Sequence, residues 1–510
     1  MADWLPDDHL AWFVLEVIDQ IDTAAFHEKR RLGRQGRQGY DPDMLLALLI
    51  YAYAVGERSS RRIEKLCVDH VAFRVLCAQD GPDHSTLARF RAVHESAFKD
   101  VFAQILRLCG EAGMVKVGVV AIDGTKIAAN SSRSANRSSE WVREQAQRAA
   151  QEIVDEAEAT DAAEDAESAV SGSGGEDLPT QFATRRGRRA NIKKALEELE
   201  RREAADTEAD ACDQENAEEF LARIEAGEAV VGPLRAGVDP VRYQRARVER
   251  QRQRIADLDG VSGKAASRQR RDARKALKQA EQALSQAEAE GQADMRGPAA
   301  RARDKRAARA RQRGATADSI NVTDPDSRMM SAGSGGGSVQ GYNAQVAVTD
   351  DHLILGIHLS QDANDTHCYR PTLAEANAHA ESLGKNIALT LADAGYFTDE
   401  NLTSPGPDRL IAPGKNHQVH TQSRERPAQG PPPKAASAKD QMRYRLRDPA
   451  AAERYKRRSA TVETVIAHLK DQIGLRRFAR RGLTAATAEL HLAAAAVNLN
   501  RLHHAKAPQG

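Results

Sequence analysis

Apolar residues recur at helical spacing through the first 115 residues. Asp41 and Pro42 supply a helix cap and a first-turn proline, and residues 44–54 are apolar on nearly every side. A helix that is apolar all round is normally buried. The pattern therefore predicts an all-α N-terminal domain over residues 1–115, with the run at 44–54 as its core helix.

The end of this domain permits a DNA-binding interpretation. A helix over residues 59–69 and a basic helix after Pro82 would be separated by a turn, which is the layout of a helix-turn-helix. Arg89 and Arg91 would then lie near DNA. The alternative is a plain helical bundle whose arginines face solvent.

From residue 117 the apolar positions become β-branched. Val-Gly-Val-Val-Ala-Ile at residues 117–122 fits a buried strand, and Asp123 and Gly124 follow it directly. We expect this strand to end at Asp123 and a return strand to run near residues 126–129. A carboxylate at a strand end is placed to bind a metal ion. The alternative is that Asp-Gly only opens a hairpin turn.

A second α/β segment begins near residue 319. Strands are predicted over residues 339–348 and 352–359, joined by a short polar turn, and an amphipathic helix is predicted over 372–383. The apolar run at 387–392 is then followed by Asp393, which repeats the strand-then-aspartate pattern of Asp123.

Two helices are predicted at the C-terminal end. Residues 455–473 show an apolar stripe at helical spacing, with Glu463 and Lys470 two turns apart on one side. A final alanine-rich helix is predicted over residues 483–502. Alternating strands and helices of this kind predict an α/β fold.

The middle of the chain has a different composition. Residues 151–179 contain ten acids and no Lys or Arg, which is typical of a linker, and residues 185–205 favour a helix. Residues 241–316 carry 21 Lys and Arg against 9 Asp and Glu and predict a helical hairpin. The basic helices either contact the DNA backbone or form a solvated coiled-coil spacer. The predicted divisions are 1–115, 116–135, a partly disordered helical insertion over 136–318, 319–502, and a tail at 503–510.

Composition narrows the class of protein. The formal net charge is only +1, and the five cysteines form no C-x-x-C pair, which argues against a disulfide framework or a zinc knuckle. The N-terminus lacks the basic start of a signal peptide, and the longest apolar run is too short to cross a bilayer. These features predict a soluble, cytoplasmic protein.

Three acids are candidates for a shared metal site. Asp123 and Asp393 follow strands, and Glu463 lies on a later helix among basic residues. Carboxylates suit Mg²⁺, and a pair of such ions can promote phosphodiester cleavage. Glu463 alone is equally explained by a solvated ion pair.

At this point the sequence resembles the DDE-class transposases of bacterial insertion sequences, which have an RNase H-like catalytic core. The resemblance covers nearly the whole chain except the insertion. It rests on Tyr-Asp-Pro-Asp-Met-Leu-Leu at 40–46, Pro82 to Arg91, Val-Ala-Ile-Asp-Gly-Thr at 120–125, Thr-Asp-Pro-Asp-Ser-Arg at 323–328, Gln-Gly-Tyr-Asn-Ala-Gln at 340–345, Ala-Asp-Ala-Gly-Tyr at 392–396, and Tyr455, Arg458, Glu463 and Lys470. Four residues separate Arg458 from Glu463, one more than in the commonest form of that signature.

The resemblance implies a function and its residues. Asp123, Asp393 and Glu463 would hold two Mg²⁺ or Mn²⁺ ions, with which the enzyme cuts at the element's ends and joins the freed 3′-hydroxyl to target DNA. DNA contacts would come from Tyr455, Arg458, Lys470, Arg476 and Arg477. A homodimer on the DNA and a place in the bacterial nucleoid are expected. The alternative is a sequence-specific DNA-binding protein on the same scaffold that lacks strand-transfer activity.

Overall fold

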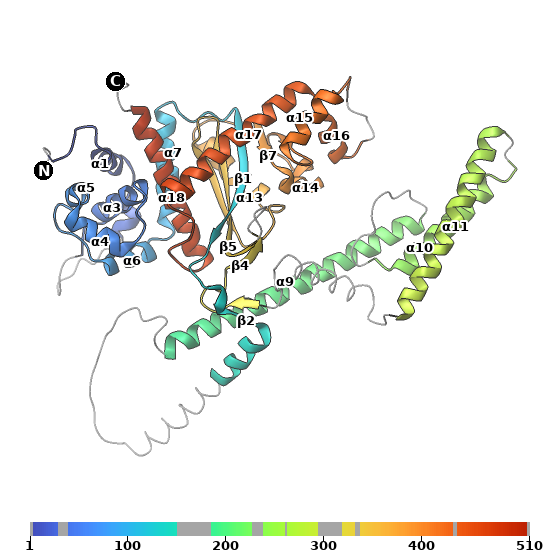
Figure 1. Ribbon diagram of the computed structural model, residues 1–510, viewed down its shortest axis with the longest axis horizontal. Coiled ribbons are helices and arrows are strands. Elements are labelled where there is room, and N and C mark those ends of the chain that lie inside the picture. Colours follow the sequence, from blue (N-terminus) through green and yellow to red (C-terminus); the bar gives the residue numbers. More distant parts are fainter. Residues whose placement is uncertain are drawn as a thin grey trace, which may run out of the picture. The chain divides into compact units, whose positions relative to one another are not determined.

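The computed structural model describes residues 4–28, 39–149, 185–226, 238–260, 263–293, 319–331, 337–431 and 436–506 (Figure 1). Contacts divide the chain into two units. The first unit joins residues 1–136 to 321–510, and the second consists of residues 137–320. Among the described helices, none is both long and apolar enough to span a membrane.

The N-terminal part of the first unit is helical, as predicted. Its helices are α1 (Leu10–Gln20), α2 (Ala24–His27), α3 (Pro42–Ala54), α4 (Ser60–Asp69), α5 (Val71–Leu76), α6 (His84–Val93) and α7 (Ala97–Glu111). The Asp41 side chain accepts the N–H groups of Asp43 and Met44, and residues 45–54 of α3 are all buried. The predicted core helix and its cap are therefore confirmed.

A mixed sheet forms the centre of the same unit. Its strands are β1 (Val119–Ala128), β4 (Arg328–Ser331), β5 (Ser338–Thr349), β6 (Ile354–Ser360), β7 (Leu389–Ala392) and β8 (Asp408–Ile411). β5 runs antiparallel to β1, β4 and β6, whereas β7 runs parallel to β1 and β8. β1 is thus central, and the mixed α/β architecture agrees with the predicted RNase H-like core.

The expectation that β1 ends at Asp123 is wrong. β1 continues through Asp123 and Gly124 to Ala128, and Asp123 pairs with Val346 of β5 in unbroken register. The hairpin alternative is wrong for the same reason. A long partner strand supplies hydrogen bonds on one side of β1, so the Asp-Gly pair stays extended despite its turn preference.

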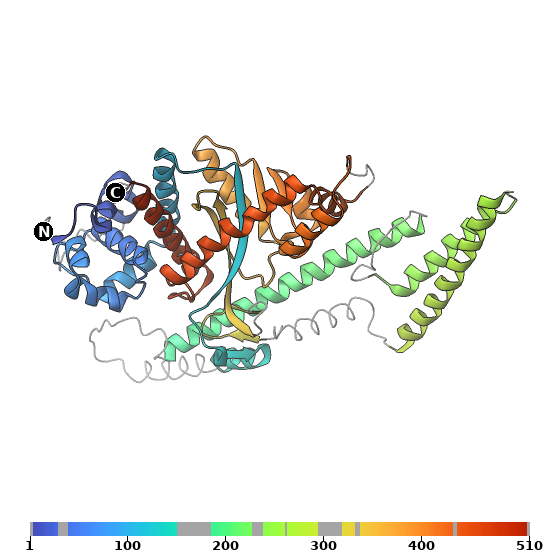
Figure 2. The ribbon, with the colours of Figure 1, turned by 45° about the horizontal axis from the view of Figure 1, so that its top comes forward.

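Helices pack around this sheet. The larger ones are α13 (Tyr369–Ser382), α17 (Pro449–Ala467) and α18 (Leu483–Lys506), and the smaller ones are α14 (Asp399–Thr403), α15 (Asn416–Glu425) and α16 (Ala438–Arg445). α17 contacts β1, β5 and β7 and crosses in front of β1 in Figures 1 and 2. It runs directly into a π-helical turn, His468–Gln472.

One hydrophobic core joins the N-terminal helices to the sheet. α18 contacts α3, α7 and β6, and buried residues of all these elements belong to the same cluster. The approach is close at Gly56, which follows α3 with φ +81°: a methyl group there would lie 2.4 Å from the Gln472 carbonyl oxygen. The N-terminal helices therefore share one hydrophobic core with the sheet and have no separate core of their own.

The motif at residues 323–328 has a structural role at the start of α18. Asp324 is buried and accepts hydrogen bonds from the Tyr342 hydroxyl at 2.8 Å and the Gly482 N–H at 3.1 Å. Asp326 accepts the Leu483 N–H at 2.8 Å. Carboxylates at a helix N-terminus satisfy N–H groups that the helix itself leaves unpaired.

The second unit is mainly helical. It contains α9 (Arg185–Glu225), α10 (Pro240–Asp257) and α11 (Lys264–Ala293), and the short strands β2 (Asn136–Ser138) and β3 (Ser319–Asn321) pair where the chain leaves and re-enters the first unit. Ion pairs Arg245–Glu288 and Arg252–Glu281 set α10 and α11 antiparallel, which confirms the hairpin. Its seam on α11 is an alanine heptad, Ala266, Ala273, Ala280 and Ala287, all buried. The acidic stretch at 151–179 lies outside the described residues.

Candidate active site

Asp123 and Asp393 lie side by side on neighbouring strands. The parallel pairing of β1 with β7 runs from Val119 opposite Leu389 to Ile122 opposite Ala392. Asp123 and Asp393 are the next residue on each strand. Parallel strands therefore bring together two carboxylates that lie 270 positions apart in the sequence.

Arg458 holds the first of these carboxylates. Its Nη1 donates to Asp123 Oδ2 at 2.7 Å, and the two side chains are 10% and 18% exposed. The other oxygen, Oδ1, accepts the N–H of Gly124 at 2.8 Å. Tyr455 lies one turn earlier on α17 and is fully buried. Tyr455 and Arg458, predicted to contact DNA, are instead buried beside the acids.

The surroundings of the two aspartates disfavour their charged forms. Burial raises the pKa of Asp123 above its ordinary value, and Arg458 opposes this rise. Burial also raises the pKa of Asp393, and the neighbouring Asp123 raises it further, against a hydrogen bond from the Gly395 N–H. Two like charges in a desolvated site disfavour each other's ionisation. A positive charge placed between them would relieve that cost.

The third predicted acid lies differently. Glu463 is exposed on α17 and makes no hydrogen bond or ion pair within the described part of the chain. At 3.6 residues per turn it lies about 140° around the helix from Arg458. The structure thus brings Asp123 and Asp393 together, whereas Glu463 lies on a solvent-exposed side of α17.

A further carboxylate, which sequence reasoning missed, lies beside the pair. Asp365 is in the loop between β6 and α13, and it raises the pKa of both Asp123 and Asp393. Its Oδ1 accepts from Asn343 Nδ2 at 2.8 Å and from Gln345 Nε2 at 2.9 Å. The sequence around residue 365 is polar and has no periodicity that distinguishes this acid. It could be identified only from the pairing of β5, whose Asn343 and Gln345 contact it.

The predicted basic residues fall into two groups. Arg89, Arg476 and Arg477 are exposed, and Lys470 is half-buried in the π-helical turn, where burial lowers its pKa. Arg91 is buried at 6% exposure and donates to the Arg58 carbonyl at 3.0 Å and to Ser60. Its guanidinium joins α6 to the α3–α4 connection. A direct contact between Arg91 and DNA is therefore at odds with its position.

A basic groove lies between the N-terminal helices and the segment after the π-helical turn. Its volume is about 760 Å³, and its described lining contains six arginines and one acid, Glu57. The arginines are Arg58, Arg61, Arg62, Arg91, Arg477 and Arg480. Arg58 and Arg480 are tied to Glu489 and Glu95, whereas Arg61 and Arg477 are exposed. A concave surface with this charge suits a polyanion.

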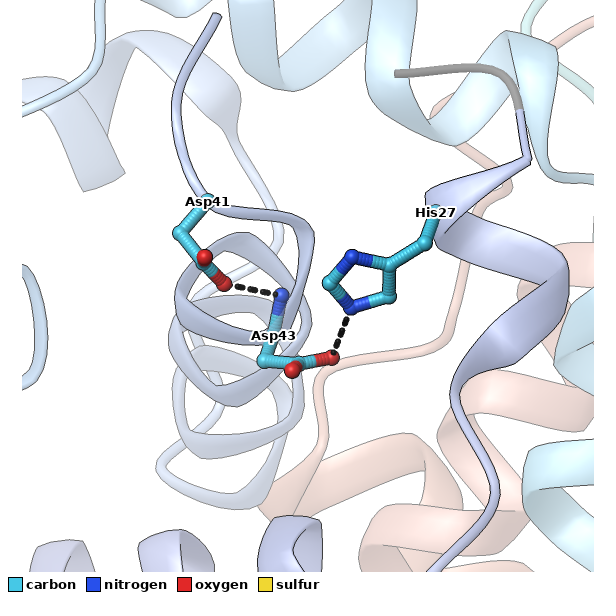
Figure 3. A group of neighbouring side chains, drawn as sticks. All are labelled: His27, Asp41 and Asp43. Atoms are coloured by element: carbon cyan, nitrogen blue, oxygen red, sulfur yellow. Dashed lines mark hydrogen bonds and ion pairs between the residues drawn. The ribbon is translucent and has the colours of Figure 1, made fainter.

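A second group of possible metal ligands lies on the N-terminal helices (Figure 3). His27 Nε2 contacts Asp43 Oδ1 at 2.9 Å, and Asp41 Oδ1 accepts the Asp43 N–H at 2.9 Å. Helix capping and one hydrogen bond account for all three side chains. We therefore assign this group a structural role.

The residues around Asp123 and Asp393 fit a hard divalent cation. All of the acids there offer carboxylate oxygen, the ligand that Mg²⁺ and Mn²⁺ favour. Asp393 Oδ2 accepts no hydrogen bond from the described residues, so an oxygen is available for a ligand bond. Burial raises the pKa of both carboxyl groups, and the charge of Asp123 raises the pKa of Asp393 further, so a cation bound beside them would favour their ionised forms.

Comparison with known proteins identifies the family. Residues 309–499 match a family model described as a transposase DDE domain, and residues 1–93 match a second one described as a transposase domain (DUF772). No curated protein and no solved structure matches the chain. The first match contains Asp393, Glu463 and the strands β5 and β7 that flank β1, and the second covers the helices from α1 to α6; Asp123 lies between the two matched ranges. The chain belongs to the DDE-type transposases of insertion sequences.

Proposed function

We propose that this transposase cuts DNA at the ends of its insertion sequence and joins the freed 3′-hydroxyl to target DNA. The observation that carries the proposal is the pairing of Asp123 and Asp393 on adjacent strands in a chain of this family. When bound, two divalent ions supply activation of the attacking oxygen and stabilisation of the leaving oxygen.

Three acids of this chain would hold the ions. Asp123 is fixed by Arg458 and by the Gly124 N–H, and Asp393 is fixed by the Gly395 N–H. Glu463 is the third acid of the proposed set; its exposed carboxylate has no ion pair with the described residues and is available. Arg458 orients Asp123, and we reassign it and Tyr455 from DNA contact to positioning of that carboxylate.

DNA would be held by the exposed cations. Arg476 and Arg477 follow the π-helical turn that carries Lys470, and Arg89 lies exposed on α6. The basic groove that Arg477 shares with Arg61 gives the DNA backbone a path along the first unit. Neutralising phosphates with such residues supplies affinity without sequence preference. A homodimer is the proposed assembly, because two ends must be brought together.

The test is cleavage of labelled duplexes that carry the terminal repeats flanking this gene. Reactions would contain Mg²⁺, Mn²⁺ or EDTA, with Asp123→Asn, Asp393→Asn and Glu463→Gln beside the unsubstituted protein. We expect metal-dependent cuts at the repeat ends, lost in all three variants while the DNA is still bound. Glu453→Gln is the matched control, because Glu453 is also exposed on α17 and forms an ion pair with Lys456.

The outcomes separate the two candidate functions. Binding of the repeat without cleavage under any metal condition would favour a DNA-binding protein on a transposase scaffold. Retained cleavage in Glu463→Gln alone would remove that residue from the ligand set and leave the two aspartates in place.

A further inference from the structure

The hairpin of the insertion divides its charge along its length. Its helices α10 and α11 lie side by side in Figures 1 and 2, with the buried alanine heptad of α11 against α10. Residues 264–278 of α11 contain seven Lys and Arg against one acid, whereas residues 279–293 contain three Glu and no Lys or Arg. The basic half of α11 is the half next to its connection with α10.

The acidic half of α11 is neutralised by its partner helix. Glu281 pairs with Arg252 at 3.3 Å, and Glu288 pairs with Arg245 at 3.6 Å. All four side chains belong to the hairpin itself. In this half, cations and acids are therefore used to join α10 to α11.

The cations of the basic half lie together on the outward face of α11. The face, called the basic face below, consists of five exposed residues, Arg268, Arg271, Arg274, Lys275 and Lys278. The alanine heptad lies on the opposite face of the same helix. Within the described part of the chain, none of these five cations forms an ion pair. The basic face therefore carries positive charge that the hairpin does not neutralise.

This arrangement works against the stability of α11. Residues three or four apart are neighbours on a helix, and Arg271 has a cation at each of residues 268, 274 and 275, so like charges repel there. Cations near the start of a helix also oppose its dipole, and the first turn of α11 contains no acid. A spacer that only faces solvent gains from mixed charges. A bound polyanion would relieve both kinds of repulsion.

The basic face has dimensions that suit a phosphate backbone. The ten residues from Arg268 to Lys278 span about 15 Å of helix, at about 1.5 Å per residue. Duplex DNA carries one phosphate charge per about 1.7 Å of its axis. Several phosphates can therefore lie within reach of the five cations at once.

We propose that the basic face of α11 binds the phosphate backbone of duplex DNA. The inference rests on the proposed function in that DNA is the polyanion on which this chain acts. It deepens that function, because it gives the insertion a DNA-binding role that is separate from the paired aspartates and from the basic groove. Since phosphates are the same in every sequence, the face adds affinity for any duplex and no preference for the terminal repeat.

The experiment measures filter binding of the whole protein to two radiolabelled duplexes in EDTA over a salt series. One duplex carries the terminal repeat and the other a scrambled sequence. Arg271→Gln with Lys275→Gln should lower the magnitude of the slope of log K against log salt by about 1.8, at about 0.9 per phosphate contact, equally on both duplexes.

The matched control is Arg245→Gln with Arg252→Gln. It removes two charges from the same hairpin, but from cations that glutamates already neutralise, so the slope should stay near that of the parent. Exchange of the two test residues, Arg271→Lys with Lys275→Arg, keeps the charge and should also keep the slope. Far-UV circular dichroism would verify helicity, and Arg268→Gln with Lys278→Gln replaces the first variant if that one loses helix.

The outcomes separate this inference from the proposed function. Equal slopes in the glutamine variant and its control, or a change confined to the repeat duplex, would overturn the inference; metal-dependent cleavage by the parent would still support the function. The expected change in slope without any cleavage by the parent would support the basic face and count against the function. Unchanged DNA binding with loss of binding to polyglutamate would overturn the inference and assign the face to an acidic protein partner.

Discussion

At the scale of single residues, environment decides what each acid can do. Asp41 lies before a proline and Asp393 between two alanines, yet Asp41 is an exposed cap at the start of α3, whereas Asp393 is partly buried beside a second carboxylate. Desolvation and a neighbouring like charge raise the pKa of a carboxyl group, whereas a carboxylate at an N-cap uses its charge to accept backbone N–H groups. Two predictions follow from that difference at the active site.

Asp393→Asn should stabilise the metal-free protein at neutral pH. Because the folded-state pKa of Asp393 is raised above 3.8 by burial and by Asp123, its protonated form favours the fold, and that contribution is lost as pH rises through the folded-state pKa. The melting temperature of the variant in EDTA should therefore exceed that of the parent above this pKa, with the gap closing toward pH 3.8. Saturating Mn²⁺ should reverse the order, since only the parent keeps the ligand. An unchanged gap from pH 4 to pH 8 would contradict the assignment.

Arg458→Met should destabilise the protein by about 3–5 kcal/mol, the usual cost of removing one partner of a buried ion pair. Asp123 would be left buried without its cation. Urea unfolding measures the change. In the double variant Arg458→Met with Asp123→Asn, much of the loss should be recovered, which a double-mutant cycle would show. Additive effects would mean that the two side chains do not interact.

At the scale of elements, caps and strand register place the functional groups. α3 begins at a capped proline, α18 begins on Asp324 and Asp326, and β1 runs straight through Asp123 because β5 pairs with it. In each case backbone N–H groups bond to a partner. Only for α3 does that partner, Asp41, lie next to the element in the sequence. The next two predictions concern a cap and the basic groove.

Asp41→Ala should cost about 1 kcal/mol of unfolding free energy, the usual value of an N-cap, while Asp41→Asn should be nearly neutral because Asn caps equally well. The Asp41 carboxylate accepts two N–H groups at the start of α3. Urea titrations with and without Mn²⁺ measure both variants. A Mn²⁺-dependent stability that disappears in Asp41→Asn would show that the group in Figure 3 binds metal after all.

Arg477→Ala should weaken DNA binding and lower the magnitude of the slope of log K against log salt by about 0.9, the value for one phosphate contact. Arg477 is exposed and lines the basic groove. Fluorescence anisotropy over a salt series measures the slope. Arg107→Ala is the control, since Arg107 is exposed on α7 and pairs with Glu111 outside the groove. Equal slopes in the two variants would exclude the groove from the DNA path.

At the scale of the whole molecule, a long insertion interrupts the fold without entering its core. Residues 137–320 form their own unit, and the chain departs and returns through the paired strands β2 and β3. The hydrophobic cluster that contains the sheet draws its residues from both sides of the insertion. A loop this long between adjacent points adds little closure entropy beyond that of a shorter one.

Replacing residues 140–315 with a short Gly-Ser linker should leave the first unit folded, with a cooperative melting transition and a Mn²⁺ affinity close to that of the full chain. The reason is that its core residues lie outside the deleted segment. Circular dichroism and Mn²⁺ titration measure both properties. An insoluble or non-cooperative product would show that the insertion is part of the fold.

Local sequence determined much of this protein. The helix cap at Asp41, the apolar run of α3, the strands β5 and β6 and the α10–α11 hairpin follow from contacts between residues close in the chain, so pattern and propensity suffice. The family could also be read from motifs. Asp123 and Asp393 were found because each follows an apolar β-branched or leucine-rich run.

Only the tertiary structure decided the rest, because it depends on pairing between distant segments. β5 keeps Asp123 extended where Asp-Gly would locally turn. Arg91 is buried between helices and Tyr455 and Arg458 are buried against the sheet, although their sequence neighbours are those of surface residues. Asp365 reaches the pair of aspartates through the register of β5 and β6. No local pattern encodes which distant carboxylates will share a desolvated space, and that sharing is what makes the site.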